Sequence, residues 1–239
     1  MKLNVLFLLL PAALLCGCET RQMNLVAPDI GVFVDRRRSV TEKEIQEAFE
    51  QKPTIKAGNT IGIVFVSGTD SSGNAVQVGT ADESKAWQSA FQDSYLVSDV
   101  VFLSSEFTPS VRDIRVLRRN AATLNCDLLL IYGVSCDYSR RANPLSVLYI
   151  TVIGAFFIPG DTLTAASIAR AALINVRTGH VYGVVEASAS QSTVLPTVWI
   201  SGSLTQMYRN VSLNALRELR KKLRPIIDRL RDQVVEVAE

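Results

Sequence analysis

Few side chains in this sequence could work together in catalysis. The 239 residues include one histidine, His180, and four cysteines, at positions 16, 18, 126 and 136. A serine hydrolase needs a histidine base beside its nucleophile, and a thiol nucleophile needs a neighbour that stabilises the thiolate. Neither pattern surrounds these residues, and they supply too few ligands for a zinc or haem site. The sequence therefore gives no positive signal for an enzyme, and we predict no catalytic, metal or cofactor-binding residues.

One loop has the position of a phosphate-binding loop but lacks its residues. Gly68 to Gly73 follows a predicted strand and precedes a predicted helix. A Walker A loop continues with lysine and then serine or threonine, whereas Asn74 and Ala75 follow here. Asp70 within the loop would also repel a phosphate. We interpret this segment as a surface loop and expect no nucleotide partner.

The N-terminus offers a different kind of chemistry. Lys2 precedes an apolar stretch of thirteen positions, shorter than the about 20 residues of a membrane-spanning helix and typical of a secretion signal. The ending Leu15-Cys16-Gly17-Cys18 resembles the bacterial lipobox, in which a small residue precedes a cysteine whose thiol accepts a diacylglycerol. We predict a signal peptide over residues 1–17, cleavage between Gly17 and Cys18, and a diacylglycerol plus an N-acyl chain such as palmitate on Cys18.

This lipid would place the protein in the bacterial envelope. Each buried CH₂ contributes about 0.8 kcal/mol, so two or three acyl chains hold a protein durably at a bilayer. By resemblance to other bacterial lipoproteins, Glu19 directly after the cysteine favours the periplasmic face of the outer membrane over the inner membrane. Secretion without acylation is the alternative.

The periplasm permits disulfides, yet we expect Cys126 and Cys136 to remain thiols. They flank a run that predicts one strand, and ten extended residues span about 33 Å. A disulfide requires Cα atoms within about 7 Å of each other. A sharp break of the strand at Gly133 would change this expectation.

Length and composition favour one domain behind a short tether. Hydrophobic residues make up 48% of the chain and charged residues 20%, which allows a sizeable core and excludes a disordered chain. The net charge of +2 is too balanced to indicate nucleic acid as a partner. We assign residues 18–40 to a lipidated tether and residues 41–239 to a single periplasmic domain.

The first half of this domain alternates helices and strands. A capping box begins a short helix at Thr41. Three apolar runs predict buried strands: 61–66, 97–104 and 127–134. Amphipathic patterns predict a helix from about Asp82 and another after Pro109, between these strands. The β-α-β-α-β order predicts a layered α/β core.

The second half predicts an antiparallel meander followed by a helix. Leu145 to Ile158 is dense in β-branched and aromatic residues, which favours a strand. Pro159-Gly160 suits a type II turn, and residues 162–176 return as a second strand. After a turn at 177–180 another strand begins, so the sheet is of mixed α/β (α+β) class. A long amphipathic helix is predicted over 205–237, kinked or split by the proline at position 225.

The predicted hairpin 145–176 could touch a membrane or a partner. Its candidate contact side chains are Leu148, Ile150, Val152, Phe156 and Phe157. Each arm is long enough to cross a bilayer, but strands that cross membranes alternate apolar and polar residues, and this run alternates poorly. A buried strand or a subunit interface is therefore favoured over membrane insertion.

Several phrases resemble known lipoprotein families. A-x-x-x-x-D-L-L-L-I-Y-G-V and I-N-V-R-T-G-x-V-Y are similar to periplasmic lipoproteins related to the curli secretion channel. LSVLYITVIGAFFIPGD (Leu145 to Asp161) and L-x-x-L-x-x-x-L-x-P-I-x-x-x-L (Leu216 to Leu230) more closely resemble the rhombotarget lipoprotein family. That resemblance implies no catalytic activity and no cofactor. The chain ends in a charged helix instead of a transmembrane sorting tail, so direct processing by a rhomboid-type protease is not expected.

Two functional hypotheses follow from these features. The first is a non-enzymatic, membrane-anchored lipoprotein of the bacterial cell envelope that acts as a periplasmic adapter or assembly factor. The alternative is an oligomeric secretion-pore subunit that inserts the 145–176 hairpin into the outer membrane. The expected partners are membrane lipid through Cys18 and an envelope protein or a second copy of the chain. Nucleic acid and nucleotides are not expected as partners.

Overall fold

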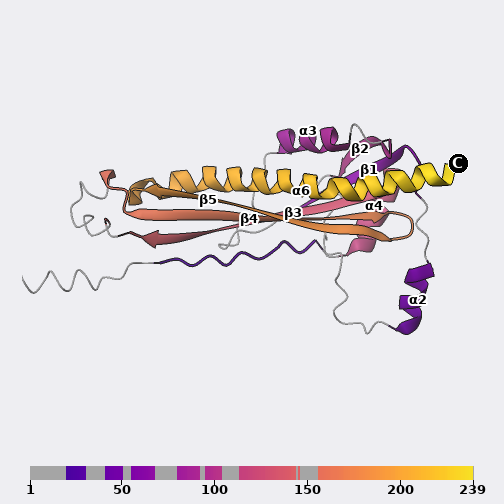
Figure 1. Cartoon of the computed structure of the whole chain (residues 1–239), viewed down its shortest axis with the longest axis horizontal. Helices are drawn as coiled ribbons and strands as arrows, with labels where there is room; N and C mark the ends of the chain where they lie inside the picture. Colours follow the sequence, from indigo (N-terminus) through magenta and orange to yellow (C-terminus); the bar gives the residue numbers. More distant parts are fainter. Residues whose placement is uncertain are drawn as a thin grey trace, which may run out of the picture.

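A five-stranded mixed sheet and a long C-terminal helix organise the chain (Figure 1). The computed structural model describes residues 20–30, 41–50, 55–67, 80–91, 95–103, 113–143, 145 and 156–238. The strand order is β2-β1-β3-β4-β5. This arrangement confirms the predicted mixed α/β class.

The parallel half of the sheet follows the predicted order. The strands are β1 (Asn59–Ser67), β2 (Val97–Leu103) and β3 (Leu128–Ala142), and β1 pairs in parallel with both of the others. The crossovers contain α3 (Thr80–Phe91) and α4 (Ile114–Thr123). A separate short helix, α2 (Glu42–Glu50), begins one residue after Thr41, as predicted.

The two crossover helices bury opposite faces of the sheet. Trp87 and Phe91 of α3 share one core cluster with Ile61 of β1. Leu117 of α4 shares the other cluster with Val64, which points to the opposite side of the same strand. The sheet is therefore covered by helices on both faces near β1.

The antiparallel half consists of three long strands. β4 (Asp161–Asn175) pairs with β3 along all fifteen residues, and β5 (Val181–Leu195) pairs with the other edge of β4. The turn between β4 and β5 lies where the sequence predicts it. β1 pairs with β3 only as far as Val134, so the second half of β3 extends well beyond the parallel half.

The predicted pairing of β4 with a strand at 145–158 is wrong. β4 pairs with β3 instead, and Phe156 and Phe157 lie in a helical turn. Leu148, Ile150 and Val152 lie outside the described residues. The apolar run predicts that the third strand ends at Val134. In the structure the more polar residues after Val134 continue β3, because β4 offers their backbone groups a full set of hydrogen-bond partners.

The C-terminal helix α6 (Ile200–Ala238) packs along one face of the sheet (Figure 1). Leu216, Leu219 and Leu223 of the predicted amphipathic helix are buried in the same core cluster as Trp87. The sequence predicts a kink or a split at Pro225, and the split is wrong because α6 is one continuous helix across this residue. Pro225 faces solvent, and buried Leu223 and Ile227 hold the helix against the core on either side of it.

Candidate functional site

Residues 20–30, the N-terminal segment, lie along the edge of β3 that β1 leaves free. The backbone N–H of Arg21 donates to the carbonyl of Arg140 and the reverse bond is also formed, both at 3.0 Å. Further along, a Cβ on Gly133 would meet Pro28 at 3.0 Å, so glycine is what allows this close approach. Ile30 is 2% exposed and belongs to the core cluster of α4. The segment thus runs antiparallel to β3 and is part of the fold.

A buried carboxylate fastens this segment. Asp137 of β3 is 1% exposed and accepts hydrogen bonds from the Arg21 guanidinium at 3.1 Å and from the backbone N–H of Asn24. The Arg21 guanidinium also lies 3.8 Å from the centre of the Tyr138 ring. Gly17 and Cys18 lie outside the described residues, but Thr20 is only two residues beyond Cys18. The predicted acylation site is therefore adjacent in sequence to a segment fixed on β3.

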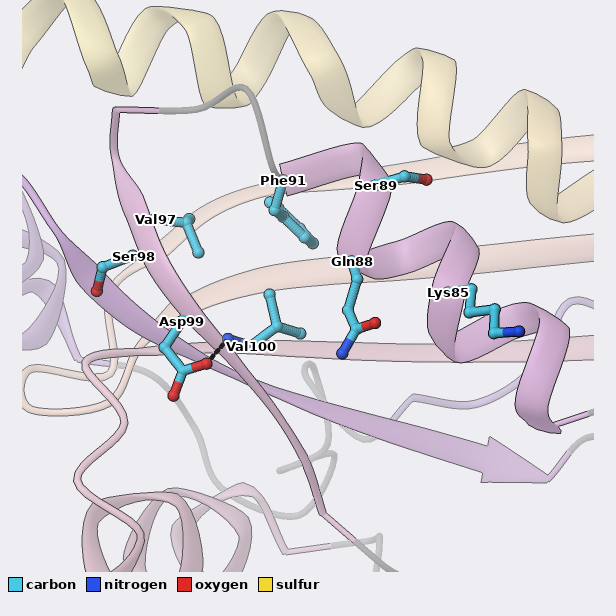
Figure 2. A pocket seen from close by; sticks show the side chains of 8 residues that line it. All are labelled: Lys85, Gln88, Ser89, Phe91, Val97, Ser98, Asp99 and Val100. Atoms are coloured by element: carbon cyan, nitrogen blue, oxygen red, sulfur yellow. Dashed lines mark hydrogen bonds between the residues drawn. The ribbon is translucent and has the colours of Figure 1, made fainter.

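A groove lies between α3 and β2, within the part of the chain that the structure describes (Figure 2). Its volume is about 440 Å³. Figure 2 shows Gln88 reaching from α3 toward Val100 of β2, with Phe91 beneath the helix. Ser98 and Asp99, both exposed residues of β2, also line the groove. Because β2 is an edge strand of the sheet, this groove offers both backbone and side-chain groups to a partner.

A second groove of about 400 Å³ lies on the other side of α3, against α6. Its rim is basic, formed by Arg217, Arg220, Lys221 and Arg224 of α6. The Arg220 guanidinium lies 5.5 Å from the Trp87 ring, within the range of a cation–π contact. Four cations on one rim favour an anionic surface as the occupant.

Glu83 is a buried carboxyl group one turn before Trp87 on α3. It is 4% exposed, and burial raises its pKa, while the Tyr132 hydroxyl and the Arg220 charge act in the opposite direction. The Tyr132 ring lies 5.1 Å from the Trp87 ring, which places this polar group among the aromatic side chains beneath α3. Glu83 therefore links α3 electrostatically to β3 and α6.

A larger cleft, of about 1010 Å³, lies on the opposite face of the sheet beside α4. Its basic lining residues are Lys56, Arg115, Arg118, Arg119 and Arg177. The Arg118 guanidinium donates to the carbonyls of Val176 and Arg177, at 2.9 and 2.7 Å, so it is held by the turn after β4. Basic clefts consequently occur on both faces of the same half of the molecule.

The candidate nucleophiles are not assembled into a catalytic group. Cys126 and Cys136 are buried free thiols, as predicted. Burial, with Asp127 and Asp99 nearby, raises the pKa of Cys126 to about 11, which disfavours the thiolate. Cys136 lies 2.9 Å from the Ser212 hydroxyl beneath α6, and His180 packs against Tyr182 after the β4–β5 turn. Among the described residues, no three His, Cys, Asp or Glu side chains are grouped to hold a metal.

Of the residues predicted to contact a membrane or a partner, Phe156 and Phe157 are described, and both lie at one end of the sheet. Phe156 and Phe157 are 49% and 78% exposed, near the start of β4. In the portion of the chain that the structure describes, no helix combines the length and apolar character needed to cross a bilayer.

The sequence does not lead us to expect the buried carboxyl groups of Asp137 and Glu83. A signal for Glu83 is present, because Glu83, Trp87 and Phe91 are spaced by four residues on one helix face.

Comparison with solved structures finds several similar chains. The C-terminal domain of LpoB from Salmonella enterica is 13% identical, with a TM-score of 0.34 over 61% of this chain and 92% of that domain. The lipoprotein GNA1162 from Neisseria meningitidis is 12% identical, with a TM-score of 0.32 over 61% and 96% of the two chains. PelC from Paraburkholderia phytofirmans, a dodecamer, is 15% identical, with a TM-score of 0.27 over 73% and 91%.

These likenesses carry no argument about function at such identities and TM-scores. No family model matches the chain, and no curated protein matches its sequence. The resemblance to rhombotarget lipoproteins therefore stays a prediction.

Proposed function

We propose that this protein is a non-enzymatic lipoprotein of the bacterial cell envelope, acylated on Cys18, that acts as a periplasmic adapter. The observation that carries the proposal is the attachment of the N-terminal segment to β3. The backbone of Arg21 is hydrogen-bonded to Arg140, so a fixed part of the fold lies three positions after Cys18 in the sequence. An acyl anchor at this point would hold the domain close to the membrane.

The long strands separate the anchor from the clefts. Arg140 lies near the end of β3, whereas Asp127 beside the start of β3 lines the cleft next to α4. Fifteen residues of β-strand span about 50 Å. Figure 1 shows α3, α4, β1 and β2 gathered at the half of the molecule that contains the start of β3. An anchor at Cys18 would therefore present the clefts well away from the bilayer.

The charge of the clefts indicates the kind of partner. Basic side chains line the α3–α6 groove and the cleft beside α4. Complementary charges speed association and suppress binding of wrong partners. We therefore propose a partner with an acidic surface, held through the α3–α6 groove and the neighbouring edge of β2. Glu19 after Cys18 supports the outer membrane as the anchoring membrane.

The sheet argues against the secretion-pore alternative. β4 forms the second arm of the 145–176 segment and is hydrogen-bonded to β3 on one edge and to β5 on the other. Insertion of this segment would break both ladders and expose their backbone groups. The adapter is favoured because it requires no such rearrangement.

Site-specific crosslinking in cells tests the adapter. A photoreactive residue replaces Gln88 in the α3–β2 groove or Ala86 in the α3–α6 groove of the full, acylated chain, with a matched control at exposed Gln191 of β5. We expect one envelope protein to crosslink from both groove positions and not from Gln191. Adding Arg217→Glu and Arg224→Glu should abolish these crosslinks. Crosslinks only between copies of this chain would contradict the adapter.

A further inference from the structure

Six exposed apolar side chains form a surface that we call the apolar tip. They are Leu145, Phe156, Phe157, Val194, Val198 and Trp199. Phe157 is 78% exposed and Trp199 is 62% exposed, both unusual for large apolar residues in water. In the part of the chain that is described, ten large hydrophobic side chains are exposed, so most of them belong to this surface.

Strand register brings the tip residues to the same end of the sheet. Ala142 at the end of β3 pairs with Asp161 at the start of β4, and Asp161 pairs with Leu195 at the end of β5. The backbone N–H of Asn143 also donates to the carbonyl of Gly160 at 2.7 Å. The end of β3, the start of β4 and the end of β5 therefore lie together, at the end of the sheet opposite the C-terminus (Figure 1).

The two connections at this end of the sheet lack charge. No Asp, Glu, Lys or Arg occurs in residues 142–160 or in residues 187–208, although charged residues make up 20% of the chain. By contrast, ten of the sixteen residues from 217 to 232 are charged. Exposed apolar side chains gathered at one end of a sheet, on charge-free connections, are typical of a site that contacts a membrane or a partner.

The position of the N-terminal segment favours a membrane as the partner of the apolar tip. It runs antiparallel to β3, so its start lies at the tip end, where Arg21 pairs with Arg140. Thr20 is two positions after Cys18, and an extended chain covers at most about 7 Å over that length. An acyl anchor on Cys18 would therefore bring a bilayer to the apolar tip.

We propose that the apolar tip docks into the interface of the bilayer that holds the Cys18 acyl chains. This inference rests on the proposed acylation. Tryptophan is enriched at membrane interfaces because its ring is amphipathic, and phenylalanine and leucine bury in the adjoining acyl region. The acyl chains hold the protein, and the tip fixes its orientation, so that the sheet projects its clefts away from the membrane.

Tryptophan fluorescence tests this orientation, because the chain has only Trp87 and Trp199 and Trp87 is fully buried. The acylated Trp87→Phe variant is reconstituted into phosphatidylethanolamine–phosphatidylglycerol vesicles with or without brominated acyl chains. We expect blue-shifted emission from Trp199 and its loss to bromine quenching. The difference between wild type and Trp199→Phe gives the same signal without altering the core.

A matched control places the reporter at the other end of the molecule. Tyr95 is 68% exposed beside the start of β2, so Tyr95→Trp combined with Trp87→Phe and Trp199→Phe should give a solvent-like, unquenched emission. If the protein is acylated and floats with vesicles but Trp199 stays solvent-like, the docking inference is overturned and the anchor stands. A shift of Trp199 that follows protein concentration and ignores bromine would assign the tip to self-association and also overturn it. Absence of acylation would instead refute the proposed function.

Discussion

Asp137 shows how a single buried carboxylate joins the start of the chain to the domain. It accepts hydrogen bonds from the Arg21 guanidinium and the Asn24 backbone across more than a hundred residues of sequence. Its own strand is also engaged, because the Tyr138 backbone N–H donates to it at 2.7 Å. Together with the backbone bonds between Arg21 and Arg140, these contacts hold the N-terminal segment on β3.

Replacing this carboxylate should release the N-terminal segment. Asp137→Ala removes the buried acceptor of the part-buried hydrogen bonds from Arg21 and Asn24, which costs about 1–3 kcal/mol of unfolding free energy. Urea denaturation measures that loss, and limited proteolysis should then cut within residues 20–30. Asp99→Ala, on exposed β2, is the matched control and should change neither. An Asp137→Ala protein with wild-type stability and protease resistance would show that this contact does not hold the segment.

Glu83 should give the fold a distinct pH dependence. Burial raises its pKa, so the folded protein keeps a proton that the unfolded chain has already released. The free energy of unfolding should therefore fall as the pH rises from the ordinary glutamate value of 4.5 through the folded pKa. Glu83→Gln should remove this decline in Tm across the acidic range, whereas exposed Glu47→Gln should leave it. A decline of equal size in Glu83→Gln would assign it to other groups.

The sequence predicts the state of the two thiols but not the buried positions of Asp137 and Glu83, and the reasons are physical. The free thiols at Cys126 and Cys136 follow from strand geometry, and the structure confirms them. Asp137 could not be recognised, because its partners Arg21 and Asn24 are brought to it only by the fold. Glu83 carried a local signal in its spacing from Trp87, which the general rule that charged side chains face solvent obscured.

At the level of elements, short apolar strands are easier to predict than long, partly polar ones. The runs at β1 and β2 stop close to their predicted ends because their apolar residues stop there too. β3 continues to Ala142 through polar residues, and its partner β4 determines that length. Phe156 and Phe157, near the end of the apolar run predicted as a strand, lie in a helical turn, and composition alone does not separate these two structures.

Pro225 leads to a prediction about α6. Proline within a helix removes a backbone hydrogen bond and costs about 3 kcal/mol relative to alanine. Since Pro225 faces solvent in a continuous helix, Pro225→Ala should raise the unfolding free energy by about 1–3 kcal/mol, measured by urea denaturation. Exposed Arg229→Ala, four residues later, should change it little. A less stable Pro225→Ala protein would indicate that the proline fits a local bend that the core requires.

The whole molecule has two chemically different ends. The apolar tip and the uncharged first turns of α6 lie at one end, whereas the charged part of α6 and the basic clefts lie at the other. This polarity matches a protein that meets a membrane with one end and a partner with the other. The charge-free segments can be recognised in the sequence, but only the strand register shows that they begin at the same end of the sheet.

The proposed roles of both ends of the molecule depend on acylation of Cys18. Metabolic labelling with palmitate tests this acylation most directly. Wild type, Cys18→Ser and the matched Cys16→Ser variant are expressed in cells, and the label in each purified chain is counted. We predict label in wild type and in Cys16→Ser, because position 16 leaves with the signal peptide, and none in Cys18→Ser. An unlabelled wild type, or label that persists in Cys18→Ser, would contradict the account.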